Sequence, residues 1–338
     1  SLIVAGALRA GHIKPNSKYF CENGRYKVGP HFIREADSHH KFGMLSVTEI
    51  LAHSSNIGVA KMALEMGGEQ IENILRDFGF GSRTGVDLPG EASGIIQKRP
   101  WRDHLLANIS FGHGLTATPL QIAASYAVIA NGGELKTPIL VKAAVHPETG
   151  KRIEYQAKTI RRVLTPEQAA TMRLILNVAT SDWGTGKTAR VPGYPVAGKT
   201  GTAQKNVPGQ GYVKGQYISS FVGFIPVNDP KFVIYVAVDN PKKKYYGSEV
   251  AAPLFARMAG YAVRSSGLPP VIMNEKNVVQ KSESKENLQI REQSIQKIRD
   301  MAKVLTDEEH NRTPDFKGLS LREVYNRVKG TPLRIEVH

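Results

Sequence analysis

The sequence has very little cysteine and only a short apolar run at its start, and the scarcity of cysteine excludes two kinds of site. Cys21 is the only cysteine in 338 residues, which excludes an intramolecular disulfide and a zinc site built from several thiolates. The apolar run at residues 1–8 is too short to span a bilayer. With 41% hydrophobic and 22% charged residues, the chain is not disordered throughout, collagenous or a coiled-coil rod.

Acidic residues are also scarce relative to basic ones. The chain has 45 Lys and Arg against 30 Asp and Glu, a net charge of +15. This excess favours anionic partners such as phosphate-bearing lipids, anionic glycans or nucleic acid, without choosing among them. The length suits one large domain or two ordinary ones.

Helical patterns dominate the first half of the chain. Residues 48–67 predict two helices separated by an exposed loop at 54–58, where polar residues and a glycine gather. Thr118-Pro119 and Thr165-Pro166 each combine an N-cap with a proline suited to the first helical position. The helices that follow are expected to end near Asn131 and Val178.

Strand-like patterns follow Gly193. β-branched and aromatic residues predict strands at 195–204, 217–225 and 232–239, the last two joined as a hairpin, and then a helix at 249–263. Helices followed by adjacent antiparallel strands and a closing helix predict an α+β fold, an antiparallel sheet flanked by helices plus an all-helical region.

The composition changes beyond Pro270. Residues 273–312 contain no Gly or Pro and many charges of both signs. Sevenfold spacing of Leu288, Ile295 and Ala302 fits a helical connector, and the charges fit a solvated linker equally well. We therefore predict a first domain at 1–270, a charged linker at 271–312 and a small α+β module at 313–338.

Lys199-Thr200-Gly201-Thr202 is the most informative motif. On an extended strand Thr200 and Thr202 share one face, and Gly201 between them lets a ligand backbone approach. Two hydroxyls beside a lysine can clamp a carboxylate. A surface strand with a solvated lysine would explain the tripeptide alone just as well.

Ser54 and Asn56 form the second candidate site, because residues two apart share a face in an extended turn and can converge on one ligand. Serine and asparagine also gather at helix breaks simply to satisfy backbone groups. This motif alone therefore leaves both interpretations open.

Together, Ser-x-Asn at a helix break and Lys-Thr-Gly on a later strand are two of the three motifs of the penicillin-binding and β-lactamase superfamily. The chain resembles the transpeptidase domain of class B penicillin-binding proteins, the division-type and sporulation-type peptidoglycan D,D-transpeptidases. The resemblance covers about residues 1–270, and 314–337 look like the start of a PASTA module. The blocks that carry it are residues 53–58, 87–91, 111–115, 118–121, 199–204 and 246–253.

The resemblance implies the penicillin-binding transpeptidase fold and acyl transfer through a serine ester. Ser54 would relay a proton, Asn56 would hold the substrate amide, and Lys199 would supply positive potential. The substrate-binding residues would be Thr200, Gly201 and Thr202, with the two threonines on the terminal carboxylate and the Thr202 N–H as one oxyanion donor.

The chain departs from the family pattern at the first motif, Ser-x-x-Lys. That motif carries the nucleophile and the base, and both are expected just upstream of Ser1, so the chain as given is expected to lack covalent catalysis. Literal matches at 38–41, 282–285 and 294–297 begin no apolar helix, and we interpret them as chance.

The resemblance also implies partners and a location. The implied ligands are the stem peptides and glycan of peptidoglycan and β-lactam antibiotics, and the implied protein partners are other cell-wall synthesis or divisome proteins. An upstream membrane anchor would place the parent protein in the bacterial envelope, on the extracytoplasmic face of the membrane. No nucleic acid, cofactor or metal is expected. Residues 184–188 are similar to the end of a phosphate-binding loop, but Ser181 stands where the first glycine of that motif is required. His31, His39 and His40 do not have the spacing of metal ligands on a helix.

Two alternatives stay open. The chain could be a β-lactamase or β-lactam sensor, which Ala203-Gln204 and the PASTA-like tail disfavour. It could instead be a non-catalytic glycan-binding or scaffold homologue.

Overall fold

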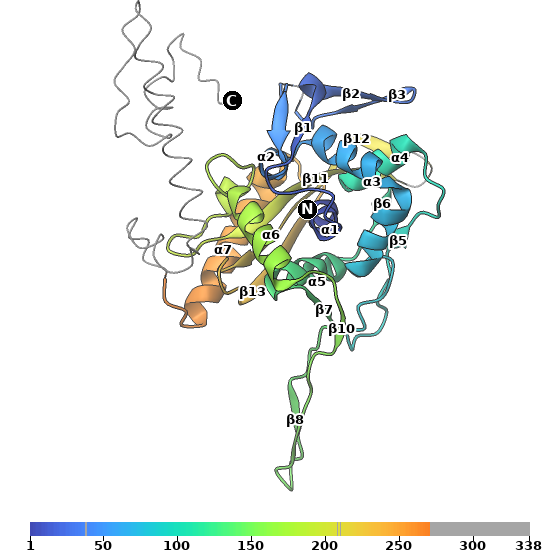
Figure 1. The fold of residues 1–338 in the computed structure, drawn as a ribbon. Helices are drawn as coiled ribbons and strands as arrows, with labels where there is room; N and C mark the ends of the chain where they lie inside the picture. Colours follow the sequence, from blue (N-terminus) through green and yellow to red (C-terminus); the bar gives the residue numbers. More distant parts are fainter. Residues whose placement is uncertain (38, 208, 210, 271–338) are drawn as a thin grey trace, which may run out of the picture. The chain divides into compact units, whose positions relative to one another are not determined.

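The computed structural model describes residues 1–37, 39–207, 209 and 211–270. The predicted charged linker and PASTA-like module therefore lie outside the described residues. Within the described part, helices cover an antiparallel sheet, so the predicted α+β class is confirmed (Figure 1).

The main sheet contains β11 (Ala197–Val207), β12 (Gly211–Ile225) and β13 (Phe232–Asp239) in that order, all antiparallel. All three strands were predicted, and β12 and β13 form the predicted hairpin. In the register of β11 on β12, Thr200 pairs with Phe221 and Thr202 with Ser219. The two candidate threonines thus lie on the strand at one edge of this sheet.

The two faces of the sheet pack against different helices because side chains alternate along each strand. On one face, Phe221 contacts Phe255 of α7 (Gly247–Ser265), with ring centroids 4.6 Å apart. On the other, Val222 and Phe224 join the larger core of the helical region. Two separate apolar clusters therefore hold the sheet from its two faces.

The helical region contains α1 (Leu2–Arg9), α2 (Val47–His53), α3 (Asn56–Asp77), α4 (Asp103–Ser110), α5 (Pro119–Ala130) and α6 (Pro166–Val178). The helices α5 and α6 begin and end as predicted. Thr118 and Thr165 cap them, each in a reciprocal capping box with the glutamine three residues later. Among the described residues no helix is long and apolar enough to cross a membrane.

The first helix break is shorter than predicted. The predicted loop at 54–58 is reduced to Ser54 and Ser55, because the Ser55 hydroxyl accepts a hydrogen bond from the Gly58 N–H and caps α3 at Asn56. The helix also continues past the predicted end at Gly67 to Asp77. Gly67 absorbs the irregularity with φ 82° and ψ 159°.

Several short strand pairs were not predicted. They are β1 (Lys18–Phe20) with β4 (Met44–Ser46), β2 (Arg25–Val28) with β3 (His31–Arg34), β5 (Ile95–Ile96) with β6 (Leu115–Thr116), β7 (Glu134–Lys136) with β10 (Thr159–Arg162), and β8 (Ala143–Val145) with β9 (Arg152–Glu154). Strand β3 matters for the site, because Arg34 at its end and Glu35 after it form hydrogen bonds with Asn56 at the break between α2 and α3.

Candidate active site

Ser54 lies between α2 and α3 in a left-handed backbone conformation, with φ 59° and ψ 41°. This conformation costs a non-glycine residue roughly 1–2 kcal/mol, so surrounding contacts must hold it. The Ser54 N–H closes the end of α2 on the Leu51 carbonyl, 3.3 Å away. The hydroxyl is thereby directed out of the helix end and toward the main sheet.

Lys199 of β11 meets this hydroxyl. Its Nζ donates to Ser54 Oγ and lies 3.1 Å from Thr200 Oγ1 and 3.3 Å from the Thr200 carbonyl oxygen. Strand alternation directs Lys199 away from Thr200, so the long side chain folds back to make these contacts. The structure therefore brings Ser54, Lys199 and Thr200 together across elements far apart in the chain.

Thr185 completes this group, and the sequence analysis missed it. Its Oγ1 lies 2.9 Å from Thr200 Oγ1, 3.2 Å from Lys199 Nζ and 3.3 Å from Ser54 Oγ. The Thr185 N–H donates to the Ala52 carbonyl at 3.0 Å, which ties its loop to α2. A threonine between two glycines shortly before Lys199 was the available signal. We call Ser54, Thr185, Lys199 and Thr200 the hydroxyl–lysine cluster.

The electrostatics of the hydroxyl–lysine cluster follow from burial. Desolvation lowers the pKa of Lys199 from 10.5 to about 8. The acceptors described for its Nζ are all uncharged oxygen atoms. Lys199 therefore carries its charge near neutral pH and attracts an anion more strongly than a carboxylate-paired lysine would.

Asn56 is the first residue of α3, and its Nδ2 donates to the Arg34 carbonyl at 3.0 Å. This contact anchors its side chain at the end of β3. Asn56 therefore lies two residues from the hydroxyl–lysine cluster on the same turn.

Thr202 and Gly201 lie where β11 meets the start of α7. The Gly247 N–H donates to Thr202 Oγ1 at 2.9 Å. A Cβ on Gly201 would lie 2.5 Å from Ser220 Oγ. The structure thus gives a second reason for glycine at this position besides the predicted one, since Ser220 fills the space that a side chain would need.

Ser1 is also close to Lys199. Its hydroxyl accepts from Tyr126 at 2.9 Å, and burial and the charge of Lys199 lower the pKa of its amino group to about 5. A peptide joined to Ser1 would begin beside the hydroxyl–lysine cluster.

The remaining sequence candidates either lie outside the described residues or make other contacts. Ser38 and the charged-linker Ser-x-x-Lys matches lie outside the described residues, and His39 contacts Asp37 at 2.8 Å. Across the described part of the chain, no three His, Cys, Asp or Glu side chains form a group that could hold a metal ion.

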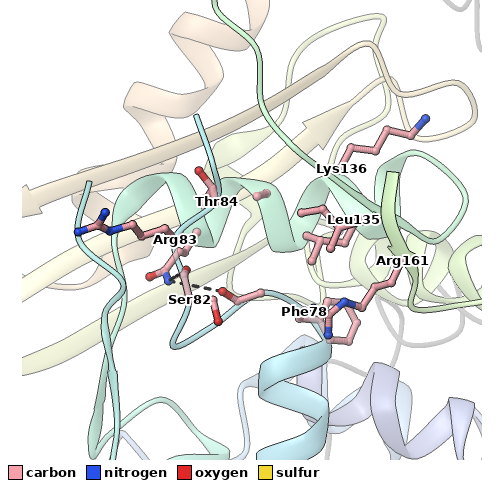
Figure 2. Close-up of a pocket in the computed structure, with 11 residues that line it drawn as sticks. Phe78, Ser82, Arg83, Thr84, Leu135, Lys136 and Arg161 are labelled. Atoms are coloured by element: carbon pink, nitrogen blue, oxygen red, sulfur yellow. Dashed lines mark hydrogen bonds between the residues drawn. The ribbon is translucent and has the colours of Figure 1, made fainter. Parts of the chain in front are cut away.

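A separate pocket of about 80 Å³ shares no residue with the cluster (Figure 2). Arg83, Lys136 and Arg161 lie around it, with Phe78 and Leu135 among its apolar residues (Figure 2). Lys136 and Arg161 form ion pairs with Glu134 and Asp77. Each therefore already has a carboxylate partner within the protein, which it shares with Arg162 at Glu134 and with Arg9 at Asp77.

A Ser-x-Asn turn that faces a Lys-Thr-Gly strand across shared hydrogen bonds defines the class of active-site serine proteins that includes β-lactamases and penicillin-binding proteins. Within that class, residues 1–260 match the family described as the penicillin-binding protein transpeptidase domain. The chain belongs to this family, and the predicted resemblance to class B members is confirmed.

Curated relatives agree with this assignment. The chain is 36% identical over 245 residues to stage V sporulation protein D of Bacillus subtilis, covering 71% of this chain and 36% of the relative. It is 38% identical over 234 residues to penicillin-binding protein PbpB of Mycobacterium tuberculosis, covering 66% and 34%. The chain thus spans about a third of the length of these two relatives.

Solved structures show the same fold. The transpeptidase domain of penicillin-binding protein 3 from Burkholderia pseudomallei matches with a TM-score of 0.70 at 33% identity, covering 79% of this chain and 78% of that one. Penicillin-binding protein 3 from Mycobacterium tuberculosis, complexed with ampicillin, matches with a TM-score of 0.73 at 32% identity, covering 83% and 64%.

Proposed function

We propose that the chain is the catalytic domain of a peptidoglycan D,D-transpeptidase that cross-links cell-wall stem peptides through a serine acyl-enzyme. The observation that carries the proposal is the hydroxyl–lysine cluster, in which Lys199 Nζ donates to Ser54 Oγ beside two threonine hydroxyls. Relatives named as peptidoglycan D,D-transpeptidases support it. These names favour transpeptidation over the β-lactamase and scaffold alternatives.

The nucleophile and the base come, in this proposal, from a Ser-x-x-Lys segment joined to Ser1. The serine oxygen attacks the carbonyl of the D-Ala-D-Ala bond while its proton passes to the lysine of that segment. Ser54 relays the proton to the nitrogen of the leaving D-Ala. An amine of a neighbouring strand then attacks the ester and forms the new amide, and a proton from that amine returns to the released serine oxygen. The position of Ser1 near Lys199 supports this arrangement.

The other site residues bind the substrate. Lys199 and the hydroxyls of Thr200 and Thr202 hold the terminal carboxylate of the stem peptide. The Thr202 hydroxyl already accepts from Gly247, so its own proton stays available for that carboxylate. The Thr202 N–H stabilises the oxyanion, Gly201 keeps the strand close to the substrate, and Asn56 holds the substrate amide.

β-Lactam antibiotics acylate the same serine because they imitate the D-Ala-D-Ala dipeptide. They inhibit the enzyme because the ester that they form is not transferred to an acceptor amine. The solved complexes of a relative with ampicillin and aztreonam support this ligand class.

For the whole protein we propose an extracytoplasmic location in the bacterial envelope, with an upstream membrane anchor and contacts with glycan and other cell-wall synthesis or divisome proteins. We also propose a linker at 271–312 followed by a PASTA-like module at 313–338.

Turnover of a stem peptide tests the proposal. The chain, produced with its Ser-x-x-Lys segment, is incubated with a stem pentapeptide that ends in D-Ala-D-Ala and with an amine acceptor. We expect free D-Ala and an equal amount of peptide joined to the acceptor, and neither product from the Lys199→Met variant. Rapid hydrolysis of nitrocefin with no D-Ala released would instead favour a β-lactamase.

A further inference from the structure

One buried carboxylate holds the turn that presents Ser54. Glu35 follows β3 and is 7% exposed. Its Oε1 accepts from the Ser55 hydroxyl at 2.6 Å, and its Oε2 accepts from the Asn56 N–H at 2.7 Å. Both oxygens thus bind consecutive residues of the Ser-Ser-Asn turn.

The neighbouring residue adds a third attachment, because the Arg34 carbonyl accepts from Asn56 Nδ2 at 3.0 Å. The last residue of β3 and the residue that follows it therefore fix the turn at a hydroxyl, a backbone N–H and a side-chain amide. Ser54 precedes these fixed points directly and has the left-handed conformation that surrounding contacts must hold.

None of the ion pairs among the described residues includes Glu35, and the cationic charge that acts on it is that of His40. Burial raises the pKa of Glu35, although hydrogen bonds from Ser55, Asn56 and Ile57 and the charge of His40 act in the opposite direction. A buried carboxylate without an ion-pair partner is costly, and the hydrogen bonds of Glu35 all go to one turn. Holding that turn is the role that the contacts give it.

We propose that Glu35 is a positioning residue for acyl transfer: it fixes the Ser54-Ser55-Asn56 turn so that Ser54 Oγ meets Lys199 and the Asn56 side chain stays at the substrate. The inference rests on the proposed transpeptidase function. Glu35 touches neither substrate nor nucleophile. It acts by keeping the proton relay in line, which matters because small displacements of a relay group reduce rates steeply.

The location of Glu35 beneath the Ser54 turn, away from β11, predicts different effects on the two steps of the reaction with a β-lactam, non-covalent binding and acylation. Lys199, Thr200 and Thr202 belong to β11 and bind the carboxylate independently of Glu35. Loss of the Glu35 contacts displaces Ser54 while β11 stays in place. The acylation rate constant k2 should therefore fall, whereas the dissociation constant of the non-covalent complex should change little.

Glu35→Gln is the decisive variant, because it keeps the shape and replaces one acceptor with an NH2 group. That group would either face the Asn56 N–H, which then loses its acceptor, or face Ser55, whose hydroxyl must then turn and accept instead of donate, so only one of the two original hydrogen bonds is kept. Glu35→Asp keeps both acceptors on a shorter side chain. A misplacement of about 1 Å costs about 100-fold, so we expect k2 to fall about 10- to 100-fold in Glu35→Gln and about 3- to 10-fold in Glu35→Asp.

Glu91→Gln is the matched control. Glu91 also holds a turn with both oxygens, accepting from the Thr84 hydroxyl and N–H and from the Gly85 N–H. None of these residues belongs to the hydroxyl–lysine cluster. Its loss should lower the melting temperature and leave k2 unchanged.

The experiment uses stopped-flow acylation of the chain with its Ser-x-x-Lys segment, over a range of nitrocefin concentrations that yields k2 and the dissociation constant separately. A wild-type protein that is never acylated would contradict the proposed function itself. Acylated wild type with equal k2 in Glu35→Gln and Glu91→Gln would overturn the positioning role. If Glu35→Gln does not fold, Glu35→Asp decides, and wild-type k2 in that variant would overturn it too.

Discussion

Replacement of Thr185 with valine tests the electrostatics of the hydroxyl–lysine cluster. Valine keeps the shape and removes the hydroxyl that lies 3.2 Å from Lys199 Nζ. A hydrogen bond to a charged group contributes about 1.5–3 kcal/mol, and 1.36 kcal/mol corresponds to one pKa unit. Because the bond stabilises the charged form of Lys199, its loss should lower the pKa of that lysine from about 8 by about 1–2 units.

An NMR titration of lysine labelled with ¹³C at Cε measures this pKa directly, with the Lys199→Arg spectrum assigning the signal. Thr188→Val is the matched control, since Thr188 lies in the same loop and donates to the Ser248 carbonyl instead. We expect a wild-type pKa near 8, no change in the control and a clear drop in Thr185→Val. A wild-type value near 10.5, or equal values in both valine variants, would refute the reasoning.

Three further outcomes follow from the same contacts. Gly247→Ala places a Cβ against the Gly201 carbonyl oxygen, so urea denaturation should show a free energy of unfolding lower by about 1–3 kcal/mol. Gly43→Ala is the control and should change it little, because the nearest atom to the added Cβ, on Phe20, is 4.0 Å away. Ser54→Ala should slow acylation about 100- to 10,000-fold with its dissociation constant nearly unchanged, and equal rates would exclude a proton relay through Ser54. Between pH 8 and 10.5 the unfolded chain retains the Lys199 proton that the folded chain has lost, so stability should rise with pH by up to about 3 kcal/mol in the wild type; a Lys199→Met variant that shows the same rise would contradict this.

Local signals predicted the regular elements well. Thr118 and Thr165 carry their capping information within three residues, so both helix starts could be located from the sequence. The β12–β13 hairpin was equally local. By contrast, β5 and β6 contain two residues each, too few for any alternation to be recognised.

The candidate site was only partly predictable, because tertiary contacts assemble it. The sequence motifs identify Ser54 and Lys199. Thr185 lies beside them because its N–H donates to the Ala52 carbonyl, a tertiary contact that no local sequence pattern predicts. Glu35 was missed for the same reason. The apparent loop after Ser54 was misjudged because a serine can cap a helix as well as break one, and Ser55 caps α3.

The proposed serine acyl-enzyme is tested most directly by locating a penicillin adduct. The chain is produced with its Ser-x-x-Lys segment, incubated with penicillin, and analysed by intact-mass and peptide mass spectrometry. We predict one acyl group, on the serine three positions before the lysine of that segment. No adduct in a folded sample would contradict the account, and an adduct on Ser38 would show that the active site has been misplaced.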